Sequence, residues 1–188
     1  MDSWVWIIIA AVVVALVVLA LAGVGFTQKR QTKRLRESFG PEYDRAMAEK
    51  GSKRSAESEL EAREKRVEQL NIRPLSPEDR TRFTEAWRST QARFVDDPTE
   101  AIGEANRLVK DVMQTRGYPV GDFEQRTSDI SVDYAEVVGN YRAAHMISLA
   151  NERGEASTED LRQAMVHYRA LFEELLELPE TERTEIRQ

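Results

Sequence analysis

The 188-residue sequence predicts an all-α protein: an N-terminal transmembrane helix, a polar juxtamembrane helix and a bundle of about four main helices. Three observations favour this fold class. Residues 4–26 carry no charged side chain, whereas residues 27–188 hold all 27 bases and 32 of the 33 acids. Beyond residue 76, apolar residues recur at the spacings of three, four and seven that are typical of amphipathic helices. No run of residues demands a β-strand.

The composition excludes several classes of protein. The chain has no Cys, which excludes disulfides, thiolate zinc sites and cysteine nucleophiles. Charged residues make up 32% of the chain, too many for a transporter with several membrane spans. The part after residue 26 has the length of one domain and can bury a core of its own.

The apolar segment Trp4–Phe26 predicts a membrane span. As a helix its 23 residues would be roughly 35 Å long at ~1.5 Å per residue, enough to cross the hydrocarbon core of a bilayer. A cleaved signal peptide is the alternative, because Ala20-Leu21-Ala22 matches a small-x-small cleavage site. The segment before the apolar run lacks the usual base, however, and the run is longer than a signal peptide needs.

Five bases follow the span closely: Lys29, Arg30, Lys33, Arg34 and Arg36. Bases flanking a span favour the cytoplasmic side. We therefore expect the N-terminus outside and the C-terminal domain in the cytoplasm, in the inner membrane if the organism is a bacterium. The same five side chains could contact anionic lipid headgroups, although setting the topology requires the same charges.

The chain divides into four predicted segments. Gly40-Pro41 ends the helix that leaves the membrane, and a short helix follows at Glu42–Lys50. The next helix, Lys53–Leu70, has a thin apolar stripe that Arg63 interrupts, so we expect it to lean on a neighbour. The segments are an anchor (1–26), a basic juxtamembrane and polar helical segment (27–75), a helical bundle (76–177) and a loose tail (178–188).

Helix starts in the bundle are marked by capping residues followed by acids. The predicted starts are Ser76, Asp97, Asp133 and Ser157, whose side-chain oxygens can accept from free N–H groups of the first turn. Asp96-Asp97 therefore fits helix capping better than a paired-carboxylate site. Gly117 before Pro119 predicts a helix end, and a further short helix is expected at residues 123–130.

Three stretches resemble a known family: Leu35–Arg45, Gln91–Pro119 and Ser131–Leu176. Together they are similar to a bacterial family of single-span, membrane-anchored proteins with a cytosolic helical domain. The resemblance implies a bacterial inner-membrane setting. It implies no catalytic residue, cofactor or partner.

Four residues of the last two main helices form a candidate pocket: Tyr141, His145, His167 and Tyr168. The short loop at residues 154–157 predicts a helical hairpin that would place the two histidines at the same level. They could form a pH-sensing or metal-binding pair. Alternatively, one histidine lies in the helix seam and the other on its rim. The spacing matches no known metal site, and no metal or cofactor is expected.

Two charged groups suggest partners. Glu173, Glu174 and Glu177 are expected on a solvated face, or alternatively on an acidic docking strip. Several arginines, Arg82, Arg88 and Arg93 among them, lie near aromatic residues and could grip phosphates. Residues 67–188 carry a net charge of −9, however, so nucleic acid is not an expected partner.

These patterns favour a non-enzymatic, membrane-tethered interaction or scaffold module. Its expected partners are the lipid bilayer and another protein, and a homo-oligomer is possible. The alternative is a small-ligand receptor or enzyme with its pocket around His145 and Tyr168. A third possibility, an envelope or secreted protein, requires cleavage of residues 1–22.

Overall fold

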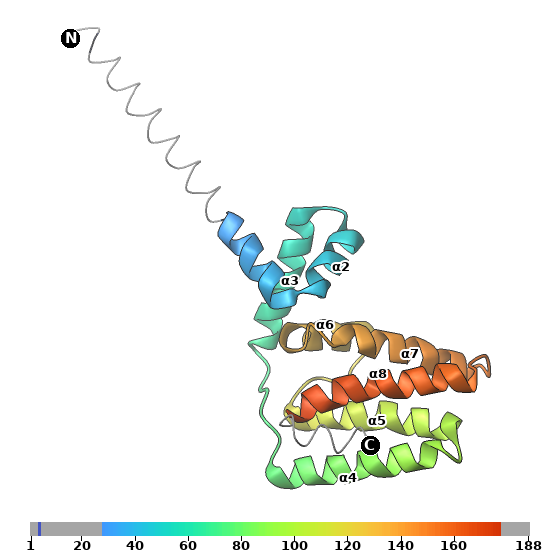
Figure 1. Cartoon of the computed structure of the whole chain (residues 1–188). Helices are drawn as coiled ribbons and strands as arrows, with labels where there is room; N and C mark the ends of the chain where they lie inside the picture. Colours follow the sequence, from blue (N-terminus) through green and yellow to red (C-terminus); the bar gives the residue numbers. More distant parts are fainter. Residues whose placement is uncertain (1–3, 5–27, 178–188) are drawn as a thin grey trace.

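The computed structural model describes residue 4 and residues 28–177, and among these it is all-helical (Figure 1), which confirms the predicted class. Residues 28–39 form a first helix, which leads into α2. The remaining helices are α2 (Pro41–Lys50), α3 (Lys53–Val67), α4 (Pro77–Phe94), α5 (Pro98–Arg116), α6 (Phe123–Asp133), α7 (Val138–Glu152) and α8 (Thr158–Leu176).

Both predicted end segments lie outside the described residues, apart from Trp4 of the membrane span. Within the described part of the chain, every helix is too short or too polar to cross a bilayer. The predicted span therefore stays a prediction, as does the loose tail at residues 178–188.

The helix of residues 28–39, α2 and α3 pack around a hydrophobic core of their own, and we call residues 28–67 the N-terminal unit. Its core consists of small and large apolar side chains that are almost completely buried: Leu35, Phe39, Tyr43, Ala46, Ala56 and Leu60. The positive φ of Gly40, 43°, allows the sharp turn between the first helix and α2.

The second core belongs to the bundle. Figure 1 shows α4, α5 and α8 as successive layers, with α7 beside α8. Trp87 of α4 is fully buried and stacks on Phe172 of α8, with 4.6 Å between ring centroids. The shorter α6 packs against both α3 and α7, so it joins the N-terminal unit to the bundle.

Three of the four predicted helix starts are confirmed. The side chains of Ser76, Asp97 and Ser157 each accept a hydrogen bond from a backbone N–H of the first turn. Ser157 and Asp160 form a reciprocal capping box. Asp97 therefore caps a helix, as predicted.

The predicted start at Asp133 is wrong. Asp133 is instead the last residue of α6, and α7 begins five residues later at Val138 without a side-chain cap. The reason is that α6 does not stop at residue 130 but continues until Tyr134 leaves helical geometry, at φ −131° and ψ 44°. The carboxylate of Asp133 accepts a hydrogen bond from the Tyr118 hydroxyl, a contact outside its own helix.

Gly117 ends α5, as predicted, in a left-handed conformation with φ 102°. The N–H of Tyr118 returns to the carbonyl of Met113 at 3.0 Å, which is typical of a Schellman cap. The linker from the N-terminal unit runs directly over this turn, because the N–H of Arg73 donates to the carbonyl of Arg116 at 2.8 Å. The end of α5 therefore fixes the path of the linker.

Candidate functional site

A buried ion pair joins the N-terminal unit to the bundle. Glu42 of α2 is 4% exposed and receives two hydrogen bonds from the guanidinium of Arg142 on α7. The Nη2–Oε2 distance is 3.0 Å. Arg63 of α3 lies 3.7 Å from the same carboxylate and also donates to Ser131 of α6. Arg63, which interrupts the apolar stripe in the sequence, therefore belongs to this junction.

A second pair reinforces the junction at α6. Arg66 of α3 donates to Asp129, which is completely buried, with an Nε–Oδ1 distance of 2.7 Å. Gln125 donates to the same oxygen at 2.8 Å. Bidentate and multiply bonded carboxylates hold their partners in a defined geometry. We infer that the two units form one body, because charged groups from both are buried between them.

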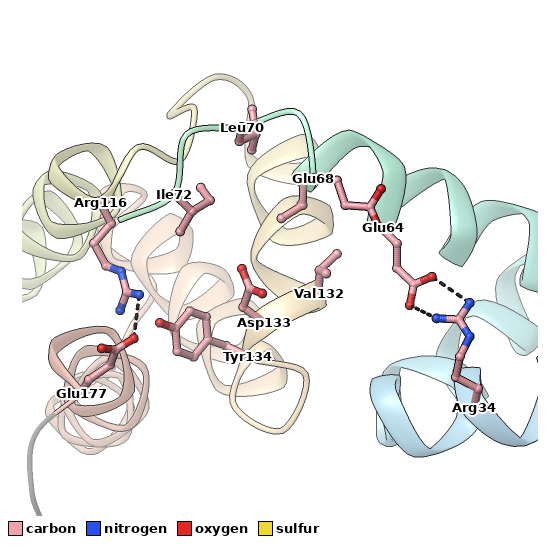
Figure 2. Close-up of a pocket in the computed structure, with 11 residues that line it drawn as sticks. Arg34, Glu64, Glu68, Leu70, Ile72, Arg116, Val132, Asp133, Tyr134 and Glu177 are labelled. Carbon is pink, nitrogen blue, oxygen red and sulfur yellow. Dashed lines mark hydrogen bonds and ion pairs between the residues drawn. The ribbon is translucent and has the colours of Figure 1, made fainter. Parts of the chain in front are cut away.

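An open cleft of about 600 Å³ lies beside this junction (Figure 2). The linker after α3, the ends of α5 and α8, and the end of α6 all contribute walls, and the first helix closes one side. Its lining residues are Arg34, Glu64, Val67, Glu68, Leu70, Ile72, Arg116, Val132, Asp133, Tyr134 and Glu177.

The two arginines of the cleft lie at opposite ends of it, and each is held by a carboxylate (Figure 2). Arg34 makes a bidentate pair with Glu64 at 2.8 and 2.9 Å. Arg116 is 5% exposed and donates to Glu177 and to the carbonyl of Leu175, both at 2.7 Å. Arg116 thereby closes the C-terminal end of α8, whose last carbonyls carry partial negative charge.

Between the arginines the cleft combines an apolar wall with surplus negative charge. Its lining includes four carboxylates and two guanidiniums, a net charge of −2. Leu70, Ile72 and Val132 are half-buried and supply apolar surface. Burial raises the pKa of Tyr134, so its hydroxyl stays protonated and can donate a hydrogen bond. A ligand with apolar groups and a positive charge would complement these walls.

The predicted pocket residues Tyr141 and Tyr168 are fully buried in the bundle and do not line this cleft. Their rings meet edge to face at a centroid distance of 6.3 Å. The Tyr141 hydroxyl accepts from Arg126 Nε at 2.8 Å, and the Tyr168 hydroxyl is 2.8 Å from Ser148 Oγ. Internal partners thus use the polar atom of each tyrosine.

The two histidines have separate partners. His145 stacks on Phe123 of α6, with ring centroids 3.7 Å apart. His167 lies 2.9 Å, through Nδ1, from the side-chain oxygen of Asn140. Within the described residues, no group of three His, Cys, Asp or Glu side chains could hold a metal ion. Each histidine thus contacts its own partner, and a metal-binding pair would lack a third ligand of these types among the described residues.

His145 is expected to titrate below 6.5, the ordinary pKa of histidine, because burial and then the nearby Arg126 lower its pKa. The unfolded chain then binds the proton more readily than the folded one. Stability is therefore full above about pH 6.5 and falls as the pH drops below it. A proton NMR titration of the ring checks this, and a midpoint at or above 6.5 would contradict the packing of His145 on Phe123.

The five predicted lipid-contact residues all lie on the first helix, but they differ in their partners. Arg34 is paired with Glu64 in the cleft, and Arg36 lies 3.6 Å from Asp44 and over the ring of Tyr43. Lys29, Arg30 and Lys33 have exposed side chains nearer the start of this helix, and Lys33 lies 3.6 Å from Glu37.

The predicted acidic face of α8 is partly wrong. Glu173 is 2% exposed rather than solvated, with Arg169 at 3.7 Å, because α8 is covered on this side by the bundle. Glu177 does reach solvent and lines the cleft. The arginines that could have gripped phosphates have acidic partners as well: Arg82 pairs with Asp79, and Arg93 with Glu104.

Comparison of the chain with protein-family models, with curated proteins and with solved structures found no match. The cleft and the junction therefore rest on the geometry alone. Neither was found from the sequence, since their residues come from segments far apart in the chain and follow no local pattern.

Proposed function

We propose that this chain is a non-enzymatic, membrane-tethered helical module that binds a protein partner at the cytoplasmic face of a bacterial inner membrane. The observation that carries the proposal is the buried pair between Glu42 and Arg142. It couples α2, which shares a core with the helix that follows the predicted span, to the bundle. A partner bound to the bundle would thereby be held at a set position near the bilayer, which raises its local concentration there.

The cleft supports this role as the partner site. It lies at the junction, it is open, and it combines an apolar wall with a surplus of two carboxylates. These walls fit a protein segment that carries apolar side chains beside a lysine or arginine. We propose a binding role rather than an enzymatic one, because the charged side chains at each end of the cleft are held in ion pairs. Arg34 pairs with Glu64 at one end, and Arg116 pairs with Glu177 at the other.

The tether and its orientation can be tested by labelling, because the chain has no cysteine of its own. In full-length protein in cells, Ser3→Cys and Ser55→Cys each introduce a single thiol. A maleimide that cannot cross the inner membrane is expected to label Ser3→Cys in spheroplasts, and Ser55→Cys only after lysis. The protein is expected to stay in the membrane pellet after alkaline extraction.

The opposite labelling pattern would contradict the proposed orientation. Release of the full-length chain by alkaline extraction would contradict the tether itself. A mature chain that begins near residue 23 would instead support the cleaved, secreted alternative.

A further inference from the structure

The structure brings the starts of two helices to the same end of the N-terminal unit. The first helix and α3 run parallel, because Gln31 bonds to Glu61 and Arg34 bonds to Glu64. Both contacts join residues 30 positions apart, so the two helices keep the same register along their length. Figure 1 shows both helices starting at the same end of this unit.

Exposed bases gather at this end, from both helices. We call them the basic end: Lys29, Arg30, Lys33, Lys53 and Arg54. Lys53 and Arg54 line one groove with Gln28 and Gln31, which places α3's bases beside the start of the first helix. Two carboxylates lie in the same groove, Glu57 and Glu61. A third carboxylate, Glu37, pairs with Lys33, so the net charge of this end is about +2.

The bases differ in how firmly the fold holds them. Lys33 lies 3.6 Å from Glu37 on the surface, and the exposed Lys53 lies 3.8 Å from the half-buried Glu57, each pair one helical turn apart. Such pairs are weak and exchange readily for another anion. Arg34, by contrast, is bonded twice to Glu64 and faces the cleft.

We propose that the basic end is a contact surface for anionic lipid headgroups, formed by Lys53 and Arg54 of α3 together with Lys29, Arg30 and Lys33. This inference rests on the proposed tether. Lys29 follows Phe26, the last residue of the predicted span, by three residues. Three residues reach at most about 10 Å, which is within the headgroup layer and one screening length of it.

The proposal moves the lipid contact away from two of the residues that the sequence suggested. Arg34 is bonded twice to Glu64, and Arg36 lies over the ring of Tyr43, further from the start of the first helix. Contact through two helices rather than one also orients the N-terminal unit on the membrane. Because the bundle is joined to that unit, the cleft is oriented with it.

The test uses the full-length chain in nanodiscs. A donor dye on Ser55→Cys reports energy transfer to acceptor dyes on the lipid headgroups. Transfer is expected to be higher in phosphatidylglycerol discs than in phosphatidylcholine discs. It is expected to fall in about 1 M salt, where the screening length is only ~3 Å.

The deciding variant is Lys53→Gln/Arg54→Gln. It is expected to lower the ratio of docked to undocked protein roughly 25-fold, at about fivefold per base. Charge reversal, Lys53→Glu/Arg54→Glu, is expected to lower it further. The matched control, Arg45→Glu/Lys65→Glu, reverses two exposed bases elsewhere in the same unit and should leave transfer unchanged. Circular dichroism confirms that each variant is folded.

Two results would overturn the proposal, and they are distinguishable. If the chain inserts but transfer is equal in both lipids, or the control variant acts like the test variant, the basic end is not a lipid surface and the tether stands. If the chain does not insert into either disc, the tether fails and this inference fails with it.

Discussion

Gly117→Ala is expected to destabilise the folded chain by about 3 kcal/mol or more. A methyl group at this position would lie 2.3 Å from the backbone oxygen of Asn71 and 3.1 Å from its carbonyl carbon. Both atoms belong to the backbone, so no side-chain rotation relieves the clash. The positive φ of 102° adds the strain that any L side chain meets there.

Substitutions at two other glycines distinguish the clash with Asn71 from the strain of a positive φ. Gly154 has φ 71° but nothing within 4 Å of an added methyl group, so Gly154→Ala should cost only about 1 kcal/mol. Gly139 lies inside α7 with open space around it, so Gly139→Ala should be neutral or stabilising by about 0.5–1 kcal/mol. Urea unfolding of the full-length chain in detergent measures all three. An equal loss of unfolding free energy for Gly117→Ala and Gly154→Ala would show that Asn71 of the linker does not pack closely against Gly117.

Glu42→Ala is expected to cost about 3–5 kcal/mol, because it leaves two buried cations facing each other without their shared carboxylate. The cations are Arg142 and Arg63, whose side chains are 14% and 10% exposed. Removing Arg142 as well relieves part of this cost. In a double-mutant cycle we expect Glu42→Ala/Arg142→Ala to be less destabilised than the sum of the single variants by about 0.5–3 kcal/mol.

The matched control for Glu42 is Glu37→Ala, in the neighbouring helix. Glu37 pairs with Lys33 at 3.6 Å on the surface, so its loss should cost less than about 1 kcal/mol. Urea unfolding followed by circular dichroism measures these variants too. If Glu42→Ala were as mild as Glu37→Ala, the N-terminal unit and the bundle would not be coupled through this pair.

The fold could be predicted from the sequence wherever a structural feature depends on residues close together in the chain. Caps at Ser76, Asp97 and Ser157 and the stop at Gly117 depend on residues a few positions apart, and all four are confirmed. Asp133 was wrongly predicted to start a helix because the residues around it resemble those around the true caps. Whether a helix continues through such a residue depends on tertiary contacts, here the Tyr118 hydroxyl.

The junction and the cleft could not be predicted in this way. Glu42 and Arg142 are 100 residues apart, and each alone looks like an ordinary surface charge. Arg63 interrupted an apolar stripe, which was a usable signal: a base on a buried face needs a buried acid. The histidines stood out because they are rare, yet rarity in a sequence does not bring residues together.

Site-specific photo-crosslinking in cells tests most directly that the cleft binds a protein at the membrane. A benzophenone amino acid is placed at Glu68 or Leu70, which line the cleft, in the full-length chain. The control position is Val95, an apolar residue that is 83% exposed and does not line the cleft.

We predict one adduct of the same mass from both cleft positions, none from Val95, and loss of the adduct when residues 4–26 are deleted. An adduct of twice the chain's own mass would identify the partner as a second copy. The same adducts from all three positions, or adducts that persist without the span, would contradict the account of a membrane-tethered module that binds its partner in this cleft.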